Sequence, residues 1–163
     1  MKILIKSRKQ IEALARNPFS EKTMLISITD ANESQVHLEY EPEFLIRLSF
    51  DDVDNDVIND ALGKKTSFEE RFEIECAYNF ISLKQADDIA NMFLRHMGEI
   101  DVLICQCEHG QSRSAAVAAA ILEFRSKRGV EVFANDKYYP NKVVYRRTLK
   151  SLQQNSLDVI SNC

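Results

Sequence analysis

The segment that most constrains the fold is DVLICQCEHGQSRSAAVAAAI, which spans residues 101–121. Its first part, DVLICQ, is a continuous apolar run of the kind found in strands that are buried on both faces of a parallel sheet. Small apolar residues follow over 114–127, and they predict a helix that Gly129 ends. A buried strand that leads directly into a buried helix predicts an α/β layered fold.

Strands and helices alternate along the rest of the chain. Strands are predicted at 2–6, 23–29 and 44–50. Helices are predicted after Ser7, from Ser82 onwards with a C-cap at Gly98, and from Pro140-Asn141 through VVYRRTLKSL. This order predicts a single layered α/β domain over residues 1–163, with a central, mostly parallel sheet flanked by helices.

The pattern is clear in the first helix and ambiguous over residues 57–81. In the first helix, Ile11, Leu14 and Ala15 share one face. Residues 57–81 give mixed signals. VINDALG is consistent with a short helix closed by Gly63, and FEIECAY with either a strand or a helix.

Composition excludes several classes of function. The formal net charge is −4 and the sequence pI is about 5.4, which disfavours a basic surface for nucleic acid or for anionic membranes. The N-terminal apolar run is too short for a signal peptide, and no stretch approaches a membrane span. The four cysteines form neither a C-x-x-C pair nor a regular framework, so free thiols in a reducing cytoplasm are expected.

The loop CEHGQSR, residues 107–113, predicts an anion site. Because it connects a strand to a helix, its backbone N–H groups can converge on one point, and Gly110 permits the positive φ that such a turn requires. Arg113 can hold two phosphate oxygens with its planar guanidinium. Cys107 would then lie below the bound phosphorus as a thiolate, and Ser114 would hydrogen-bond its sulfur. The loop residues expected to contact the phosphate are Glu108, His109, Gly110, Gln111, Ser112 and Arg113.

The sequence CEHGQSRS resembles the phosphate-binding loop of the cysteine-dependent protein tyrosine phosphatases, most closely their small dual-specificity branch of bacterial or phage type. The resemblance implies Cys107 as nucleophile, Arg113 as the clamp on the phosphate and the transition state, and Ser114 as the hydroxyl that assists thiolate release. It also implies an aspartate general acid at the end of an upstream strand. No metal or cofactor is implied.

LSFDDVDND supplies the candidate general acid. Some bacterial relatives carry a similar F-x-D followed by an aliphatic residue, which favours Asp52, with Asp51 as its rival and Asp54 a distant third. The alternative that these carboxylates bind calcium lacks the glycine and distal glutamate of an EF-hand loop. Further along, YPNKVVYRRTLKSL resembles the Pro-Asn start of the last core helix in the family, and an insertion over about 57–80 is expected to loop away.

One residue departs from the family pattern, and others have competing interpretations. Gln106 stands where the family commonly has a histidine. A glutamine can still hydrogen-bond backbone groups, and we expect reduced or differently tuned activity rather than none. His109 either contacts substrate or is simply an exposed loop residue, and the second is favoured. Cys105 either forms a regulatory disulfide with Cys107 or is an inert buried thiol. The strain of a C-x-C bridge favours the inert thiol, and Cys76 is an alternative resolving cysteine.

The combined interpretation is a phosphate monoester hydrolase that acts through a cysteinyl-phosphate. Its expected substrate is a phosphorylated protein or a small phosphomonoester, with phosphotyrosine, phosphothreonine, nucleotides and metabolites all left open. Three alternatives remain. They are a catalytically weak phosphate-binding module, an RNA 5′-phosphatase of the same superfamily and a rhodanese-like sulfurtransferase. The acidic net charge disfavours the RNA enzyme, and the Arg-Ser end of the loop fits phosphate better than sulfane sulfur.

Overall fold

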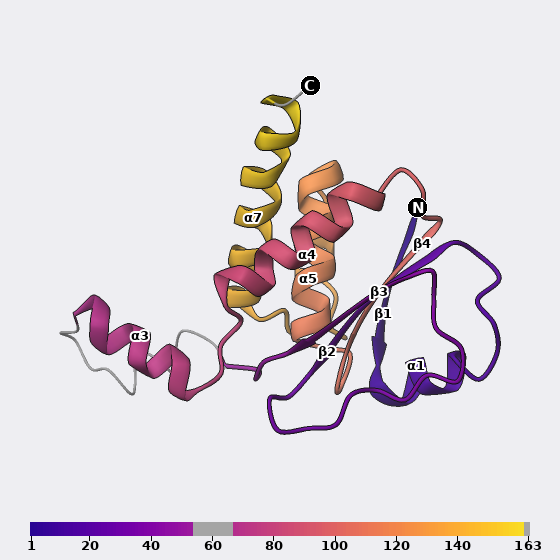
Figure 1. Cartoon of the computed structure of the whole chain (residues 1–163), viewed down its shortest axis with the longest axis horizontal. Coiled ribbons are helices and arrows are strands. Elements are labelled where there is room, and N and C mark those ends of the chain that lie inside the picture. The colour runs from indigo at the N-terminus through magenta and orange to yellow at the C-terminus, as the bar shows by residue number, and fades with distance from the viewer. Residues whose placement is uncertain (54–66, 162–163) are drawn as a thin grey trace.

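The computed structural model describes residues 1–53 and 67–161, and Figure 1 shows their arrangement. The strands in these residues form one parallel sheet in the order β1-β4-β2-β3. Their bounds are β1 (Lys2–Ser7), β2 (Thr23–Thr29), β3 (Phe44–Ser49) and β4 (Val102–Cys107). The α/β prediction with a parallel sheet is therefore confirmed, and the strand that leads into the CEHGQSR loop is central.

The helices form unequal layers on the two faces of the sheet. Their bounds are α1 (Arg8–Leu14), α3 (Phe68–Ala77), α4 (Leu83–His96), α5 (Arg113–Ser126), α6 (Val130–Phe133) and α7 (Lys142–Ser161). Helices α4, α5 and α7 pack over one face, α1 covers the other, and α6 packs against α5 (Figure 1). Helix α3 projects away from these layers, as expected of an insertion that loops away.

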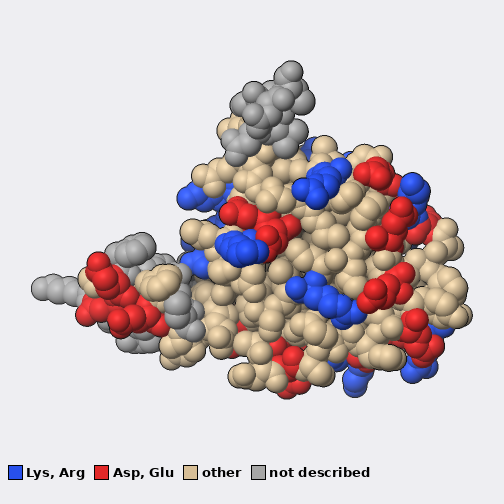
Figure 2. Space-filling model, in the orientation of Figure 1, with Lys and Arg blue, Asp and Glu red and all other residues tan. Residues whose placement is uncertain are grey.

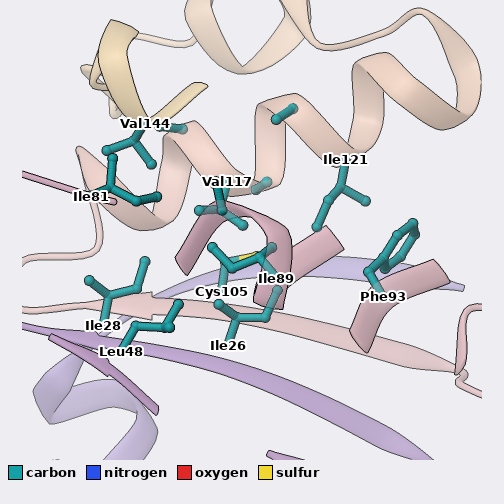
Figure 3. Close-up of a cluster of buried hydrophobic side chains, with 14 of the residues drawn as sticks. Ile26, Ile28, Leu48, Ile81, Ile89, Phe93, Cys105, Val117, Ile121 and Val144 are labelled. Carbon is teal, nitrogen blue, oxygen red and sulfur yellow. The ribbon is translucent and has the colours of Figure 1, made fainter. Parts of the chain in front are cut away.

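The core forms because β2 and β4 have no exposed side chain along their length. Alternate residues of β4 face opposite layers: Leu103 and Cys105 pack with α4, α5 and α7, while Val102 and Ile104 pack with α1. Figure 3 shows Cys105 among the aliphatic side chains of the larger cluster. Each fully buried Val, Leu, Ile or Phe side chain contributes about 1.5–3 kcal/mol, so this cluster is a main source of stability.

The helix starts follow from local sequence. Ser7 and Ser82 are N-caps, and each forms a capping box, with Gln10 and Gln85 respectively. Residues 114–121 of α5 are all buried, and most of them are alanine. These small side chains let α5 lie close to the sheet and to α7, which fixes where the helix begins beneath the loop.

Two helix-end predictions are wrong. Helix α5 ends at Ser126, and its C-cap Lys127 adopts the left-handed conformation with φ 59°. Gly129 lies beyond that cap at the start of α6, where an added Cβ would lie 2.6 Å from the Ala119 carbonyl oxygen. Helix α4 is capped by Met97 in a right-handed conformation rather than by Gly98. Leu14 is 42% exposed because only Ile11 and Ala15 of the predicted face point into the core.

The ambiguous region is partly resolved. FEIECAY belongs to helix α3 up to Ala77, which settles its choice between strand and helix. The short helix expected over VINDALG lies outside the described residues. Within the part of the chain that the structure describes, no helix combines the length and the apolar character needed to cross a membrane.

Candidate active site

The loop between β4 and α5 is held by its carbonyl groups. The Glu108 carbonyl oxygen accepts from the Arg8 N–H at 3.1 Å, and the Gln111 carbonyl oxygen accepts from the Tyr139 N–H at 2.9 Å. The C=O and the following N–H of a trans peptide point in opposite directions. The N–H groups of His109 and Ser112 therefore point away from Arg8 and Tyr139. This is the arrangement that an anion-binding loop requires.

Gly110 is required in this loop for two reasons. Its φ is +70°, a conformation in which a side chain is strained. A Cβ at this position would also lie 2.6 Å from the Ser7 nitrogen and 2.7 Å from the Lys6 carbonyl carbon. The loop therefore packs directly against the end of β1, and only glycine allows that approach.

Cys107 ends β4 and Ser114 lies in the first turn of α5. The Cys107 sulfur is 3.0 Å from the Ser114 hydroxyl oxygen, and both side chains are buried. The N-terminus of α5 adds unpaired N–H groups and the positive end of a helix dipole beside the sulfur. Both features favour an anion at this position, whether it is a thiolate or a bound oxyanion.

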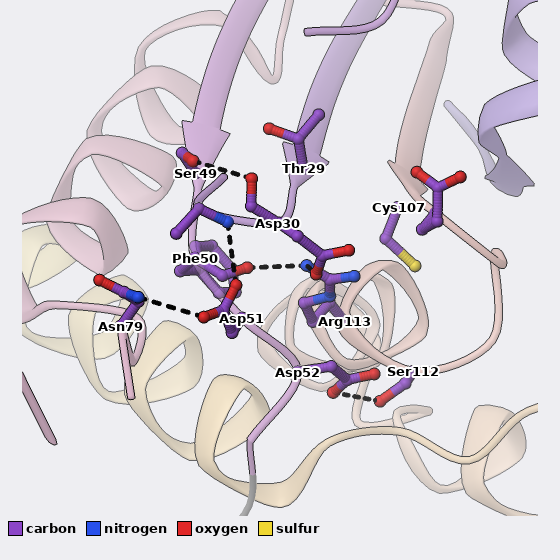
Figure 4. Close-up of polar contacts among 12 residues, drawn as sticks. Thr29, Asp30, Ser49, Phe50, Asp51, Asp52, Asn79, Cys107, Ser112 and Arg113 are labelled. Carbon is purple, nitrogen blue, oxygen red and sulfur yellow. Dashed lines mark hydrogen bonds and ion pairs between the residues drawn. The ribbon is translucent and has the colours of Figure 1, made fainter. Parts of the chain in front are cut away.

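Arg113 is only 3% exposed, and its guanidinium is held on one side. Its Nη1 donates to the Phe50 carbonyl oxygen at 2.7 Å and lies 2.6 Å from the Asp30 Oδ1 (Figure 4). Its Nε is buried and has no hydrogen-bond partner among the described residues. A buried charged donor without an acceptor is costly and rare, which points to a ligand that accepts from it.

Asp51 and Asp52 turn to different partners (Figure 4). Asp52 Oδ1 accepts from the Ser112 hydroxyl at 2.8 Å and from the Asn141 amide at 2.9 Å. Asp51 instead accepts from the Ala31 N–H at 2.9 Å and from the Asn79 amide at 3.2 Å. The structure thus brings Asp52 to the CEHGQSR loop and turns Asp51 away from it. Asp54 lies outside the described residues.

Asn141 connects Asp52 to the last helix. Its side-chain oxygen accepts from the N–H groups of Val143 and Val144, both at 3.0 Å, and so caps the start of α7. Its amide nitrogen donates to Asp52 and to the Val53 carbonyl oxygen. The Pro-Asn start of α7 is therefore also what fixes the Asp52 segment against the loop.

The Glu108 carboxylate is bound on the outer side of the loop. It lies 2.6 Å from Arg8 Nε, and this hydrogen bond is the main cause that raises the pKa of Arg8. Arg8 also donates to the Ser34 carbonyl oxygen. His109 and Gln111 are exposed. Any contact of Glu108 with a bound anion would thus be through its backbone.

The two residues that precede the nucleophile candidate face opposite sides of β4. Gln106 is buried, and its Oε1 accepts from the Ser27 hydroxyl at 2.7 Å, so its partner is a side chain rather than a backbone group. Its Nε2 has no partner among the described residues. Cys105 is a free, fully buried thiol, and burial raises its pKa. This thiol remains protonated at neutral pH, in agreement with an inert role.

Sequence reasoning missed Asp30 and Arg8. Asp30 directly follows β2, so the rule that ligands bind at the carboxyl ends of parallel strands was a signal that pointed to it.

The remaining candidate residues lie as follows. Arg147, in helix α7, donates to the Ile81 carbonyl oxygen. The side chain of Cys76 is not among those described. Among the described residues, no group of three His, Cys, Asp or Glu side chains is placed to hold a metal ion.

Comparison with known proteins gives structural relatives but no sequence relatives. No protein-family model and no curated protein matches the chain. A mouse protein described as a dual specificity phosphatase, complexed with zinc tungstate, superposes with a TM-score of 0.53 at 15% identity, over 97% of this chain and 86% of that one. PTPMT1 in complex with PI(5)P gives a TM-score of 0.50 at 10% identity, over 97% and 94%. The fold is that of the dual-specificity phosphatases.

Proposed function

We propose that this chain, which has the fold of the dual-specificity phosphatases, hydrolyses phosphate monoesters through a cysteinyl-phosphate intermediate. In this proposal Cys107 is the nucleophile, Arg113 and the backbone N–H groups of residues 108–113 bind the phosphate, Asp52 is the general acid and Ser114 assists release of the thiolate. The mechanism uses no metal or cofactor.

The observation that carries the proposal is the unpaired Nε of Arg113. It is buried at the start of the helix whose first turn holds Ser114, 3.0 Å from the Cys107 sulfur. A guanidinium edge that lacks acceptors in the protein matches two oxygens of a phosphate. Since the same groups stabilise negative charge on sulfur, the arrangement supports both halves of a thiolate mechanism.

The first step forms the S–P bond. The Cys107 thiolate attacks phosphorus, the bond from phosphorus to the ester oxygen breaks, and protonated Asp52 gives its proton to the leaving oxygen. The contacts of Asp52 with Ser112 and Asn141 support this role, because they hold the carboxyl group beside the loop. Arg113 and the loop N–H groups offset the charge that develops on the phosphoryl oxygens.

The second step breaks the S–P bond. Water attacks phosphorus and gives a proton to the Asp52 carboxylate, and the products are inorganic phosphate and the thiolate. The Ser114 hydroxyl, at 3.0 Å from the sulfur, would donate a hydrogen bond to the departing thiolate. The enzyme returns to its starting protonation state.

The surroundings favour a substrate with one phosphate. Asp30 pairs with Arg113, Asp52 accepts from Ser112, and Glu108 pairs with Arg8 on the outer side of the loop, so acidic side chains lie at or near the loop. The face drawn in Figure 2 carries mixed charges, and α3 contributes acidic residues to it. Such surroundings disfavour RNA and multiply phosphorylated head groups. We therefore favour a phosphorylated protein or a small phosphomonoester.

The test is turnover of an aryl phosphate in excess chelator. Wild-type protein is expected to release phosphate, and Cys107→Ser to release none while still binding tungstate. Binding of tungstate by wild-type protein without any turnover would identify a phosphate-binding module instead. Loss of turnover in chelator would reject the mechanism. A thiosulfate–cyanide assay run in parallel tests the sulfurtransferase alternative.

A further inference from the structure

We propose that Asp30 is a positioning residue that fixes the guanidinium of Arg113 for oxyanion binding. This inference rests on the proposed function, because it assigns a role to a residue that supports the same site. Asp30 contacts Arg113 directly, at 2.6 Å between its Oδ1 and Nη1. It follows β2, a strand on which the sequence pattern placed no functional residue.

The contact uses one part of the guanidinium and leaves another free. Nη1 carries two hydrogens, and its two acceptors are Asp30 Oδ1 and the Phe50 carbonyl oxygen. Among the described residues nothing accepts from Nε. A planar guanidinium held at Nη1 cannot rotate freely, so the edge that contains Nε keeps one direction. Bidentate binding of phosphate needs such a fixed edge.

Asp30 is itself held rigidly. Its carbonyl oxygen accepts from the Ser49 hydroxyl at 3.2 Å, and the next residue, Ala31, donates its N–H to Asp51 at 2.9 Å. Asp51 is in turn bound by the Asn79 amide. Figure 4 shows that these hydrogen bonds connect the end of β2 to the end of β3. The rival general-acid candidate thus has a structural role, since it supports the segment that carries Asp30.

The positioning role predicts the direction in which oxyanion affinity changes when Asp30 is removed. If Asp30 orients Arg113, its removal weakens oxyanion binding, because the guanidinium loses its fixed direction. If instead the Asp30 carboxylate merely competes with the phosphate for Arg113, its removal strengthens oxyanion binding. Asp30 is at the mouth of the site, with 36% of its side chain exposed, so either outcome is sterically possible. The direction of the change therefore decides between them.

The experiment is calorimetric titration of the full chain with sodium tungstate. For Asp30→Ala we expect the Kd to rise by between about 10-fold and 100-fold, in line with the cost of small misplacements at active sites. Asp30→Asn keeps an acceptor of the same shape without the charge. Its Kd for tungstate is expected to lie between the values of the wild-type protein and of Asp30→Ala. Asp101→Ala is the matched control, because Asp101 is exposed at the opposite end of β4, and its Kd should equal the wild-type value.

A double-mutant cycle separates positioning from general structural damage. In an Arg113→Lys background, Asp30→Ala should add little further loss of tungstate binding, since the guanidinium that Asp30 positions is gone. Thermal unfolding of each variant checks folding, and Asp30→Asn serves if Asp30→Ala does not fold. An unchanged or lower Kd in the folded Asp30 variants overturns the proposal. Absence of turnover in a wild-type protein that binds tungstate overturns the proposed function but not this inference.

Discussion

The two ends of the parallel sheet are closed in different ways. At the amino end of β4 the contacts are between backbone groups: the Lys2 N–H donates to the Asp101 carbonyl oxygen, and the Asp101 N–H to that of Lys22. At the carboxyl end side chains cross between strands and loops, as in the contacts of Arg113 with Asp30 and of Asp52 with Ser112. The contacts at the amino end of β4 are thus made by backbone groups, while those at its carboxyl end are made by side chains that come from several segments.

The carboxyl end of the sheet is where we expect this chain to bind a ligand. At the amino end these backbone groups satisfy one another. At the carboxyl end the Nε of Arg113 is buried without an acceptor. Chemistry is therefore expected to respond to substitutions at the carboxyl end, while substitutions at the amino end should leave it unchanged.

Cys107→Ser should have the largest effect. We expect turnover of an aryl phosphate to fall by at least about 10⁴-fold, because the hydroxyl is a far weaker nucleophile than the thiolate. Tungstate binding, measured by calorimetry, should persist. Cys105→Ala is the control, since Cys105 lies two residues earlier on the same strand and is protonated and fully buried. Equal losses in the two variants would contradict the assignment of Cys107.

Asp52→Asn should come next. Loss of a general acid is expected to lower kcat by about 10²- to 10⁴-fold. The loss should be greater for phenyl phosphate than for p-nitrophenyl phosphate, because the nitrophenolate leaves readily without a proton. Asp51→Asn should instead lower the rates for both substrates alike, since Asp51 contacts Ala31 and Asn79. The same dependence on leaving group in both variants would remove the distinction between the two aspartates.

Two glycines test the comparison through stability. Gly110→Ala should lower the free energy of unfolding by about 1–3 kcal/mol, because of its φ of +70° and the nearby Ser7 nitrogen. Gly98 precedes the amino end of β4, and nothing lies within 4 Å of its added Cβ. Gly98→Ala should therefore be neutral or stabilising by up to about 1 kcal/mol. Urea denaturation measures both, and a larger loss for Gly98→Ala would reverse the comparison.

The last prediction concerns stability at alkaline pH. Burial raises the pKa of Cys105 in the folded chain, whereas in the unfolded chain a cysteine has a pKa of about 8.5. Above that pH the unfolded state loses a proton that the folded state keeps. Ionisation of this thiol in the unfolded state should therefore lower the free energy of unfolding by about 1.4 kcal/mol for each pH unit above that pKa. Cys105→Ala should remove this contribution, which urea denaturation between pH 8 and pH 10 would reveal as a shallower decline.

Much of the fold was predictable because burial leaves a local signature. The apolar runs of β2 and β4 and the serine caps of α1 and α4 are readable without tertiary information. Helix ends were less predictable. Lys127 takes a left-handed conformation that glycine usually supplies, and Gly129 is needed for a close approach to α5.

The site was predictable where its residues are adjacent in sequence. Cys107, Arg113 and Ser114 belong to one loop and its helix, and family resemblance favoured Asp52 over Asp51. The contact of Arg113 with Asp30 was not predictable, because the two residues meet only when β2 and β4 pair. The bond between Gln106 and Ser27 was not predictable for a similar reason, since Ser27 lies on the neighbouring strand.

The tether between Arg8 and Glu108 has a consequence for biosynthesis. The ribosome releases the amino end of the chain first, so β1 and Arg8 emerge long before the loop they will hold. The contact that holds Asp52 forms later still, because its partner Asn141 must first be synthesised. A nascent chain that ends within α5 would carry Cys107 and Arg113 without Asn141, the residue whose amide binds Asp52, so the arrangement of the site is completed only after the start of α7 has been synthesised.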